Sequence, residues 1–81
     1  MTERDIAAEF EPERQHLLGL AYRMLGSVAE AEDVVQDAFI RLRSVELEQV
    51  LDVAAYLHTT VARLCLDRLK SARSRREVYV G

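Results

Sequence analysis

The chain has 81 residues, 49% of them hydrophobic, and a formal net charge of −3, which fits one small folded domain and excludes a disordered segment. It has one cysteine, so it cannot form an internal disulfide bond, and it has no apolar run long enough to span a membrane. The N-terminus has no hydrophobic leader, so we expect a cytoplasmic protein. With only three Gly and one Pro, we expect few, long elements, and therefore an all-α bundle of three to four helices forming a single domain over residues 1–81.

The first predicted helix covers about residues 12–25. Pro12 suits a first helical position, and Gly26 suits the position just after a helix end. A short extra turn over residues 6–10 is a candidate addition before it. Apolar residues at helical spacing form the predicted core stripe: Leu17, Leu18, Ala21, Met24 and Leu25.

The second predicted helix, residues 28–43, begins with a capping box. The Ser27 hydroxyl can accept a hydrogen bond from the Glu30 amide, and the Glu30 carboxylate can return one to the Ser27 amide. Acidic residues follow in the first turns and Arg41 and Arg43 in the last, as the helix dipole favours. The predicted core face consists of Ala31, Val34, Val35, Ala38, Phe39 and Leu42.

The third predicted helix covers about residues 53–76, after a connection over residues 44–51. Asp52 is its predicted N-cap. Its predicted core stripe ends at Leu69, so the last turns should project beyond the bundle. The stripe contains Leu57, Val61, Leu64, Cys65 and Leu69.

Charge is distributed unevenly along the chain. Residues 1–52 carry 5 Arg against 12 Asp and Glu, a net −7, and residues 53–81 carry 6 Lys and Arg against 2 Asp and Glu, a net +4. This indicates two surfaces with different partners, although clustering on solvated faces explains it equally well. The acidic surface would be one side of the second helix, where Asp33, Gln36 and Asp37 lie together and Glu32 borders them.

No group of residues in the sequence has the pattern of a catalytic or metal site. His16 and His58 fall on different predicted helices without Cys or acidic neighbours at ligand spacing, and Cys65 lies on an apolar stripe with no nearby base. No glycine-rich phosphate loop is present. We therefore expect no enzyme activity, no cofactor and no metal.

The segment AEDVVQDAFIRL at residues 31–42 closely resembles the second conserved region of sigma-70 family factors, with the pattern AEDxxQexFlrl. LAYRMLGS at 20–27 and LCLDRLKSAR at 64–73 resemble the same domain in extracytoplasmic-function (ECF) sigma factors. The resemblance covers about residues 10–81. REVYVG at 76–81 resembles the subgroup that adds a C-terminal extension domain, so further domains are expected beyond this chain.

The resemblance implies a transcription initiation factor domain that binds core RNA polymerase and recognises and melts the promoter −10 element. Its acidic helix would contact the coiled coil of the polymerase largest subunit through Glu32, Asp33, Gln36 and Asp37. The loop over residues 44–52 would lie near a flipped base. An anti-sigma factor and the protein's own C-terminal domains are further candidate partners. Single-stranded −10 DNA would be bound through Tyr56, Arg63, Arg68, Lys70, Arg73, Arg75 and Arg76.

Two features limit the resemblance. The family usually has Trp at the position of Tyr56, which predicts weaker stacking there. The pI near 5.3 argues against a free-standing high-affinity DNA binder. A helical interaction or oligomerisation module without DNA binding is the alternative. A duplex-binding helix-turn-helix repressor ranks lower, because it needs a short tight turn before its recognition helix, whereas the loop before the third helix here has about eight residues.

Overall fold

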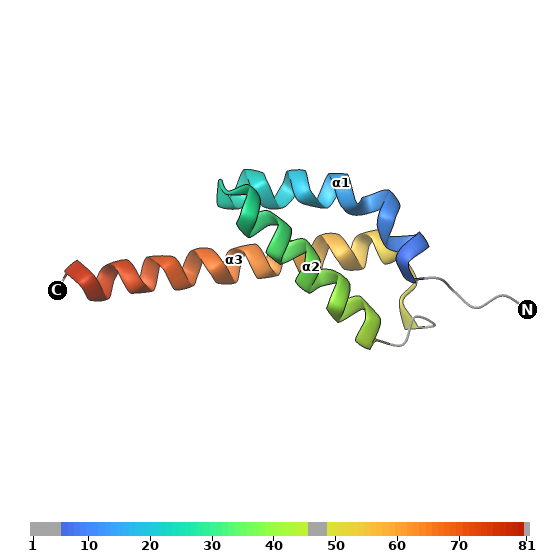
Figure 1. The fold of residues 1–81 in the computed structure, drawn as a ribbon. Helices are drawn as coiled ribbons and strands as arrows, with labels where there is room; N and C mark the ends of the chain where they lie inside the picture. Colours follow the sequence, from blue (N-terminus) through green and yellow to red (C-terminus); the bar gives the residue numbers. More distant parts are fainter. Residues whose placement is uncertain (1–5, 46–48, 81) are drawn as a thin grey trace, which may run out of the picture.

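The computed structural model describes the backbone of residues 6–45 and 49–80 and the side chains of residues 8–45 and 49–73. The described chain consists of three helices: α1 (Ile6–Leu25), α2 (Val28–Ser44) and α3 (Val53–Val80). Helices α1 and α2 pack on the first half of α3, and the second half of α3 extends past them (Figure 1). The predicted all-α bundle is confirmed.

Helix α1 begins at Ile6, so the candidate turn over residues 6–10 is confirmed, but it is continuous with the helix predicted to start at Pro12. Pro12 lies inside the helix, where its missing N–H and its ring cost about 3 kcal/mol. The turns before it bend away from the rest of α1 (Figure 1). Phe10 lies in these turns, only 5% exposed, with its ring centroid 4.7 Å from that of Phe39 on α2. Burying a Phe side chain contributes a comparable amount, about 1.5–3 kcal/mol, which explains why the helix continues through Pro12.

The link between α1 and α2 follows the predicted signals closely. Gly26 has φ 74°, the left-handed conformation that favours glycine, and its N–H donates to the Tyr22 carbonyl at 2.7 Å. Ser27 Oγ accepts from the Glu30 N–H at 3.3 Å, as predicted. The predicted return bond is wrong, because Glu30 Oε1 lies instead 3.7 Å from Arg68 Nη1 on α3.

Helix α3 begins at its predicted N-cap. Asp52 Oδ1 accepts from the Ala55 N–H at 3.1 Å, and the Asp52 carbonyl accepts from the Tyr56 N–H at 3.0 Å. Of the connection before it, residues 46–48 lie outside the described residues. The helix ends at Val80, four residues beyond the predicted end. Its 28 residues span about 42 Å at 1.5 Å per residue, so it is much longer than its two neighbours.

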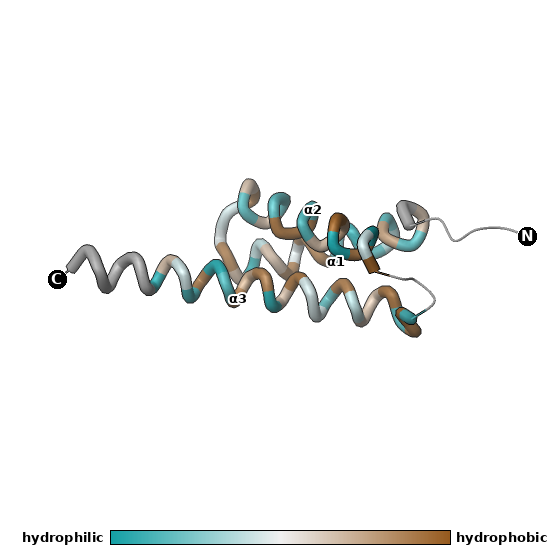
Figure 2. Tube along the Cα trace, turned by 90° about the horizontal axis from the view of Figure 1, so that it is seen from below, coloured by the Kyte–Doolittle hydropathy of each residue, from teal (hydrophilic) through white to brown (hydrophobic). Residues whose placement is uncertain are grey.

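The core lies where the three helices meet. From α3 it takes Leu57, Val61 and Cys65, each fully buried and four residues from the next. Leu69, the next position, is 42% exposed, so its assignment to the core was wrong: α3 has already left the other helices there. Figure 2 shows this end of α3 extending alone. The buried core as a whole consists of Phe10, Leu17, Ala21, Ala31, Val34, Val35, Ala38, Leu42, Leu57, Val61 and Cys65.

The buried Cys65 thiol gives the fold a pH dependence at its alkaline end. Burial raises the pKa of Cys65 above its ordinary value, although the nearby Arg68 guanidinium acts to lower it. An acid whose pKa is raised by folding stabilises the fold below its unfolded pKa and loses that contribution as pH rises through the folded one. We therefore expect the free energy of unfolding to fall above pH of about 9. Urea denaturation should show a smaller alkaline loss for Cys65→Ala than for the wild type; an equal loss would contradict this assignment.

Candidate functional site

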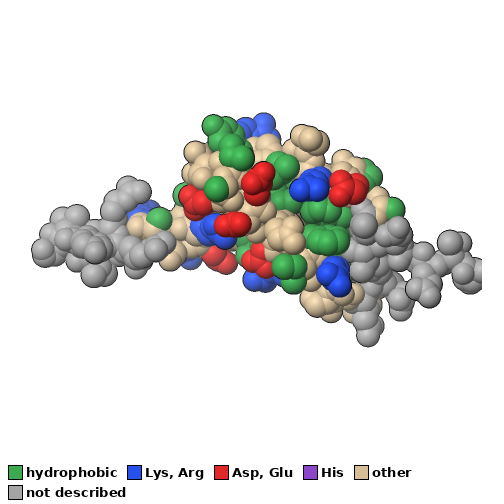
Figure 3. Space-filling model, viewed as in Figure 1, with side chains coloured by type: hydrophobic (Ala, Val, Ile, Leu, Met, Phe, Trp, Pro, Cys, Tyr) green, Lys and Arg blue, Asp and Glu red, His purple; other side chains and the backbone are tan. Residues whose placement is uncertain are grey.

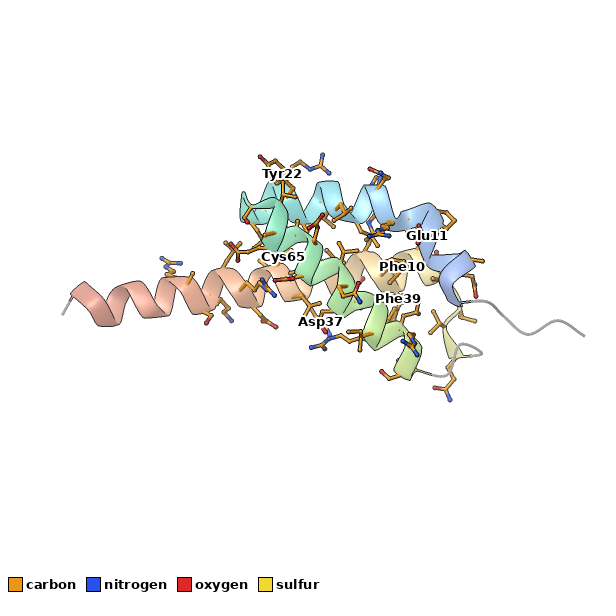
Figure 4. The ribbon with its side chains drawn as sticks, in the orientation of Figure 1. Phe10, Glu11, Tyr22, Asp37, Phe39 and Cys65 are labelled. Carbon is orange, nitrogen blue, oxygen red and sulfur yellow. The ribbon has the colours of Figure 1, made fainter. Side chains whose placement is uncertain are left out.

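The acidic face of α2 consists of Glu32, Asp33, Gln36 and Asp37, and these four side chains differ in exposure. Glu32 and Gln36 are exposed on the side toward α1, and Asp33 is exposed in the middle of the face. Asp37 lies on the side nearer α3 (Figure 4) and is half-buried. Its Oδ1 is 3.5 Å from Arg41 Nε one turn later, so its charge is partly compensated within α2. Asp33 has no ion-pair partner among the described residues.

A groove of about 330 Å³ runs between α1 and α2 beside this face. The side chains of Phe10, Leu18, Val35 and Phe39 give it an apolar floor. Its rim is polar, with Glu11 and Arg14, 3.7 Å apart, on α1 and Glu32 and Gln36 on α2. Figure 3 shows hydrophobic side chains gathered on this face with charged side chains along their edge, and Figure 4 shows Phe10 and Phe39 side by side. The acidic face therefore borders a groove that has a polar rim and apolar side chains between its walls.

Ile40 is a member of this face that the sequence analysis did not single out. It is 53% exposed, although Ile is among the residues most often buried. At 100° per residue it lies between Gln36 and Asp33 on the exposed side of α2. The helical period alone could have found it, because Ile40 is four residues after Gln36 and falls outside the predicted core face. Its position gives the acidic face an apolar centre.

A second groove, also about 330 Å³, separates α2 from α3. Arg41 lines it from α2 and Arg63 from α3, so two guanidinium groups border the same space. Asp67 places one carboxylate there as well. The remaining lining residues are Tyr56, Thr59, Thr60 and Leu64. Sequence reasoning missed Arg41, because Arg41 was assigned to the helix dipole.

The cations of α3 do not form a single strip. Arg63 and Lys70 are exposed, share one side of the helix by its period, and have no ion-pair partner among the described residues. Arg68 lies on the opposite side, toward α2, where it pairs with Glu30 at 3.7 Å. Arg68 therefore does not lie on the same side of α3 as Arg63 and Lys70. Arg73 is exposed, and the side chains of Arg75 and Arg76 lie outside the described ones.

Tyr56 lies where two surfaces meet. Its side chain is half-buried, packs against the core, and lines both the α2–α3 groove and a shallow hollow at the start of α3. That hollow has a mainly apolar lining of Val45, Val50, Leu51 and Ala55 around Gln49 and Asp52. Leu51 is 99% exposed. The described part of the connection thus presents an apolar surface next to the cationic groove.

The two histidines are neighbours in space. Their ring centroids are 4.8 Å apart, and His58 Nε2 lies 3.4 Å from Glu13 Oε1. Among the described residues, no three or more His, Cys, Asp or Glu side chains gather as a metal site requires. None of the described helices has the length and apolar character needed to cross a bilayer.

Comparison with known proteins shows the family to which the chain belongs. The chain is 51% identical over 74 residues to the ECF RNA polymerase sigma factor SigJ of Mycobacterium tuberculosis, covering 91% of this chain and 23% of that protein. It is 41% identical over 78 residues to the probable ECF RNA polymerase sigma factor SigI of the same species, covering 95% of this chain and 27% of that protein. Against the ECF RNA polymerase sigma factor SigW of Bacillus subtilis it is 36% identical over 58 residues, or 67% of this chain and 30% of that protein.

The chain thus spans about a quarter of the length of the curated relatives it matches. No solved structure matches it. The family model described as Sigma-70 region 2 matches residues 10–75, which include all the described residues of both grooves and of the acidic face. The chain therefore belongs to the sigma-70 region 2 family.

Proposed function

We propose that this chain is the part of an ECF sigma factor that docks on core RNA polymerase and binds the melted promoter −10 element. The observation that carries the proposal is the separation of two surfaces on one small bundle. An exposed acidic face with an apolar centre lies on α2, and exposed cations lie on α3. Core packing requires neither surface. The chain acts by binding, without a catalytic step, in the bacterial cytoplasm.

The polymerase-binding surface is the exposed side of α2. Asp33, Gln36 and Asp37, bordered by Glu32, would meet the basic coiled coil of the largest subunit. Exposed carboxylates steer a cationic partner and fix its register, whereas apolar contacts supply most of the affinity. Ile40, 53% exposed at the centre of this face, supplies such an apolar contact.

The DNA-binding surface is the exposed side of α3. Arg63, Lys70 and Arg73 would contact phosphates of the non-template strand, with Arg75 and Arg76 further along the helix. Tyr56, the family's usual Trp position, would stack on a base with part of its ring, because the rest packs against the core. Arg68 lies on the side of α3 that faces Glu30, away from Arg63 and Lys70, so we propose a smaller contribution from it than from those two.

The apolar hollow around Leu51 and Tyr56 suits a base turned out of the stack. Extruding a base costs a few kcal/mol, which stacking and contacts with its edge offset. Gln49 and Asp52 provide polar atoms at the same hollow. Melting would therefore use binding energy alone, without ATP.

The proposal is tested with purified bacterial core polymerase. The chain should co-elute with the core enzyme in gel filtration, and the complex should retain a fluorescent single strand of non-template −10 sequence more tightly than its complement. A folded chain that does not co-elute, or a complex without strand preference, would contradict the proposal. Self-association through apolar surface, insensitive to salt and without DNA binding, would favour the alternative helical interaction module.

Arg63 should contribute a phosphate contact, which the salt dependence of DNA binding can detect. Each phosphate contact on a single strand adds about 0.7 to the slope of log affinity against log salt concentration. We expect Arg63→Gln to lower that slope by about 0.7 and to weaken binding at low salt, measured by fluorescence anisotropy. Arg23→Gln, the same substitution at an exposed position of α1, is the control and should leave the slope unchanged. Equal slopes for the two variants would remove Arg63 from the DNA-binding surface.

A further inference from the structure

Arg41 belongs to both surfaces of the bundle. Its Nε lies 3.5 Å from Asp37 Oδ1, on the face proposed to bind polymerase. The same side chain lines the α2–α3 groove opposite Arg63, on the side proposed to bind DNA. Among the described residues, Arg41 thus connects a carboxylate of the polymerase-binding face to the groove on the DNA-binding side.

The Asp37–Arg41 pair is weak enough to be exchanged. Both side chains are about half exposed, at 45% for Asp37 and 56% for Arg41. Pairs of this exposure, one helical turn apart, contribute little, because water and salt screen them. A cationic group that approaches Asp37 would compete with Arg41 for the same carboxylate. A phosphate that enters the groove would compete with Asp37 for the same guanidinium.

We infer that Arg41 is a phosphate-contacting residue of the DNA-binding surface and that Asp37 restrains its guanidinium in the free chain. This inference rests on the proposed function and adds one residue, with its restraint, to the DNA-binding surface. Asp67 lines the same groove and weakens its preference for anions, so the free chain binds DNA poorly.

Asp33 provides a matched control for Asp37. Both are aspartates on the exposed side of α2, one turn apart, and Asn at either position changes the net charge equally. Asp33 has no ion-pair partner among the described residues, whereas Asp37 holds Arg41. A difference between Asp33→Asn and Asp37→Asn in DNA binding that disappears when Arg41 is also replaced therefore reports the release of Arg41, because the net charge of the two variants is the same.

The test measures the binding of a short fluorescent DNA single strand to the 81-residue chain at low salt by anisotropy. Arg41→Gln should weaken binding about threefold and lower the salt slope by about 0.7. Asp37→Asn should strengthen binding about twofold more than Asp33→Asn does, and this excess should vanish when Arg41→Gln is also present. Circular dichroism should show unchanged helicity, since both side chains are about half exposed.

The outcomes separate this inference from the proposed function. If Asp37→Asn and Asp33→Asn have equal effects with and without Arg41, the restraint is overturned while DNA binding stands. If Arg41→Gln leaves affinity and slope unchanged, Arg41 is no phosphate contact. If neither the chain nor its complex with polymerase binds the strand, the proposed DNA-binding function fails, and this inference fails with it.

Discussion

Replacing Leu57 by Ala should destabilise the bundle by about 2–5 kcal/mol. Leu57 is fully buried at the start of the stretch of α3 that packs on the other two helices. Truncation removes the apolar contacts of this side chain. It also leaves a cavity where the three helices meet, which the surrounding side chains fill only in part. A domain of this size has a total stability of only about 4–12 kcal/mol, so the variant should be partly unfolded at 37 °C. Urea denaturation followed by circular dichroism measures the loss.

Leu69→Ala is the matched control for this prediction. It makes the same change on the same helix, twelve residues later, at a side chain that is 42% exposed. Surface substitutions of this kind usually change stability by less than about 0.5 kcal/mol. If Leu69→Ala were as destabilising as Leu57→Ala, the core would extend along α3 as the sequence pattern suggested, and the position at which α3 leaves the bundle would be wrong.

Asp33→Arg should weaken binding to core polymerase by a factor of ten or more. The substitution places a cation in the centre of a face proposed to meet a basic coiled coil, and juxtaposed like charges cost several kcal/mol. Asp33 is preferable to Asp37 for this test, because an Arg at position 37 would also lie beside Arg41 and disturb the second groove. Competition with labelled wild-type chain for the core enzyme measures the loss.

Asp67→Arg controls for net charge in the same competition assay. It changes the charge by the same amount but lies on α3, in the second groove. Its binding to polymerase should weaken much less than that of Asp33→Arg, because position 67 is on α3 and outside the α2 face proposed to meet the coiled coil. Equal losses for the two variants would show that net charge, and not the face of α2, determines docking.

Helix α2 could be predicted from the sequence almost completely. Its cap at Ser27, its five buried core residues and its end within one residue all follow from local rules of capping and periodicity. These rules depend on near neighbours along one helix, so a single sequence contains them. The exposed positions of Glu32, Asp33 and Gln36 follow from the same periodicity.

The errors occur where contacts between helices override local preference. Pro12 favours a helix start, but the packing of Phe10 on Phe39 extends α1 past it. Leu69 continues the apolar spacing of α3, but the other helices have ended by that point. Arg68 belongs to a run of cations, yet it faces Glu30 on another helix. The sequence alone does not specify how far the helices overlap or which of their sides meet, and these three errors follow from that.

The most direct test of the docking claim is a calorimetric titration of the 81-residue chain with an isolated coiled-coil fragment of the polymerase largest subunit, at low and at high salt. We expect one-to-one binding that weakens as salt is raised and that Asp33→Arg abolishes while circular dichroism shows the helices intact. A folded chain that gives no binding, or binding that neither salt nor Asp33→Arg alters, would contradict the assignment of the α2 face to polymerase.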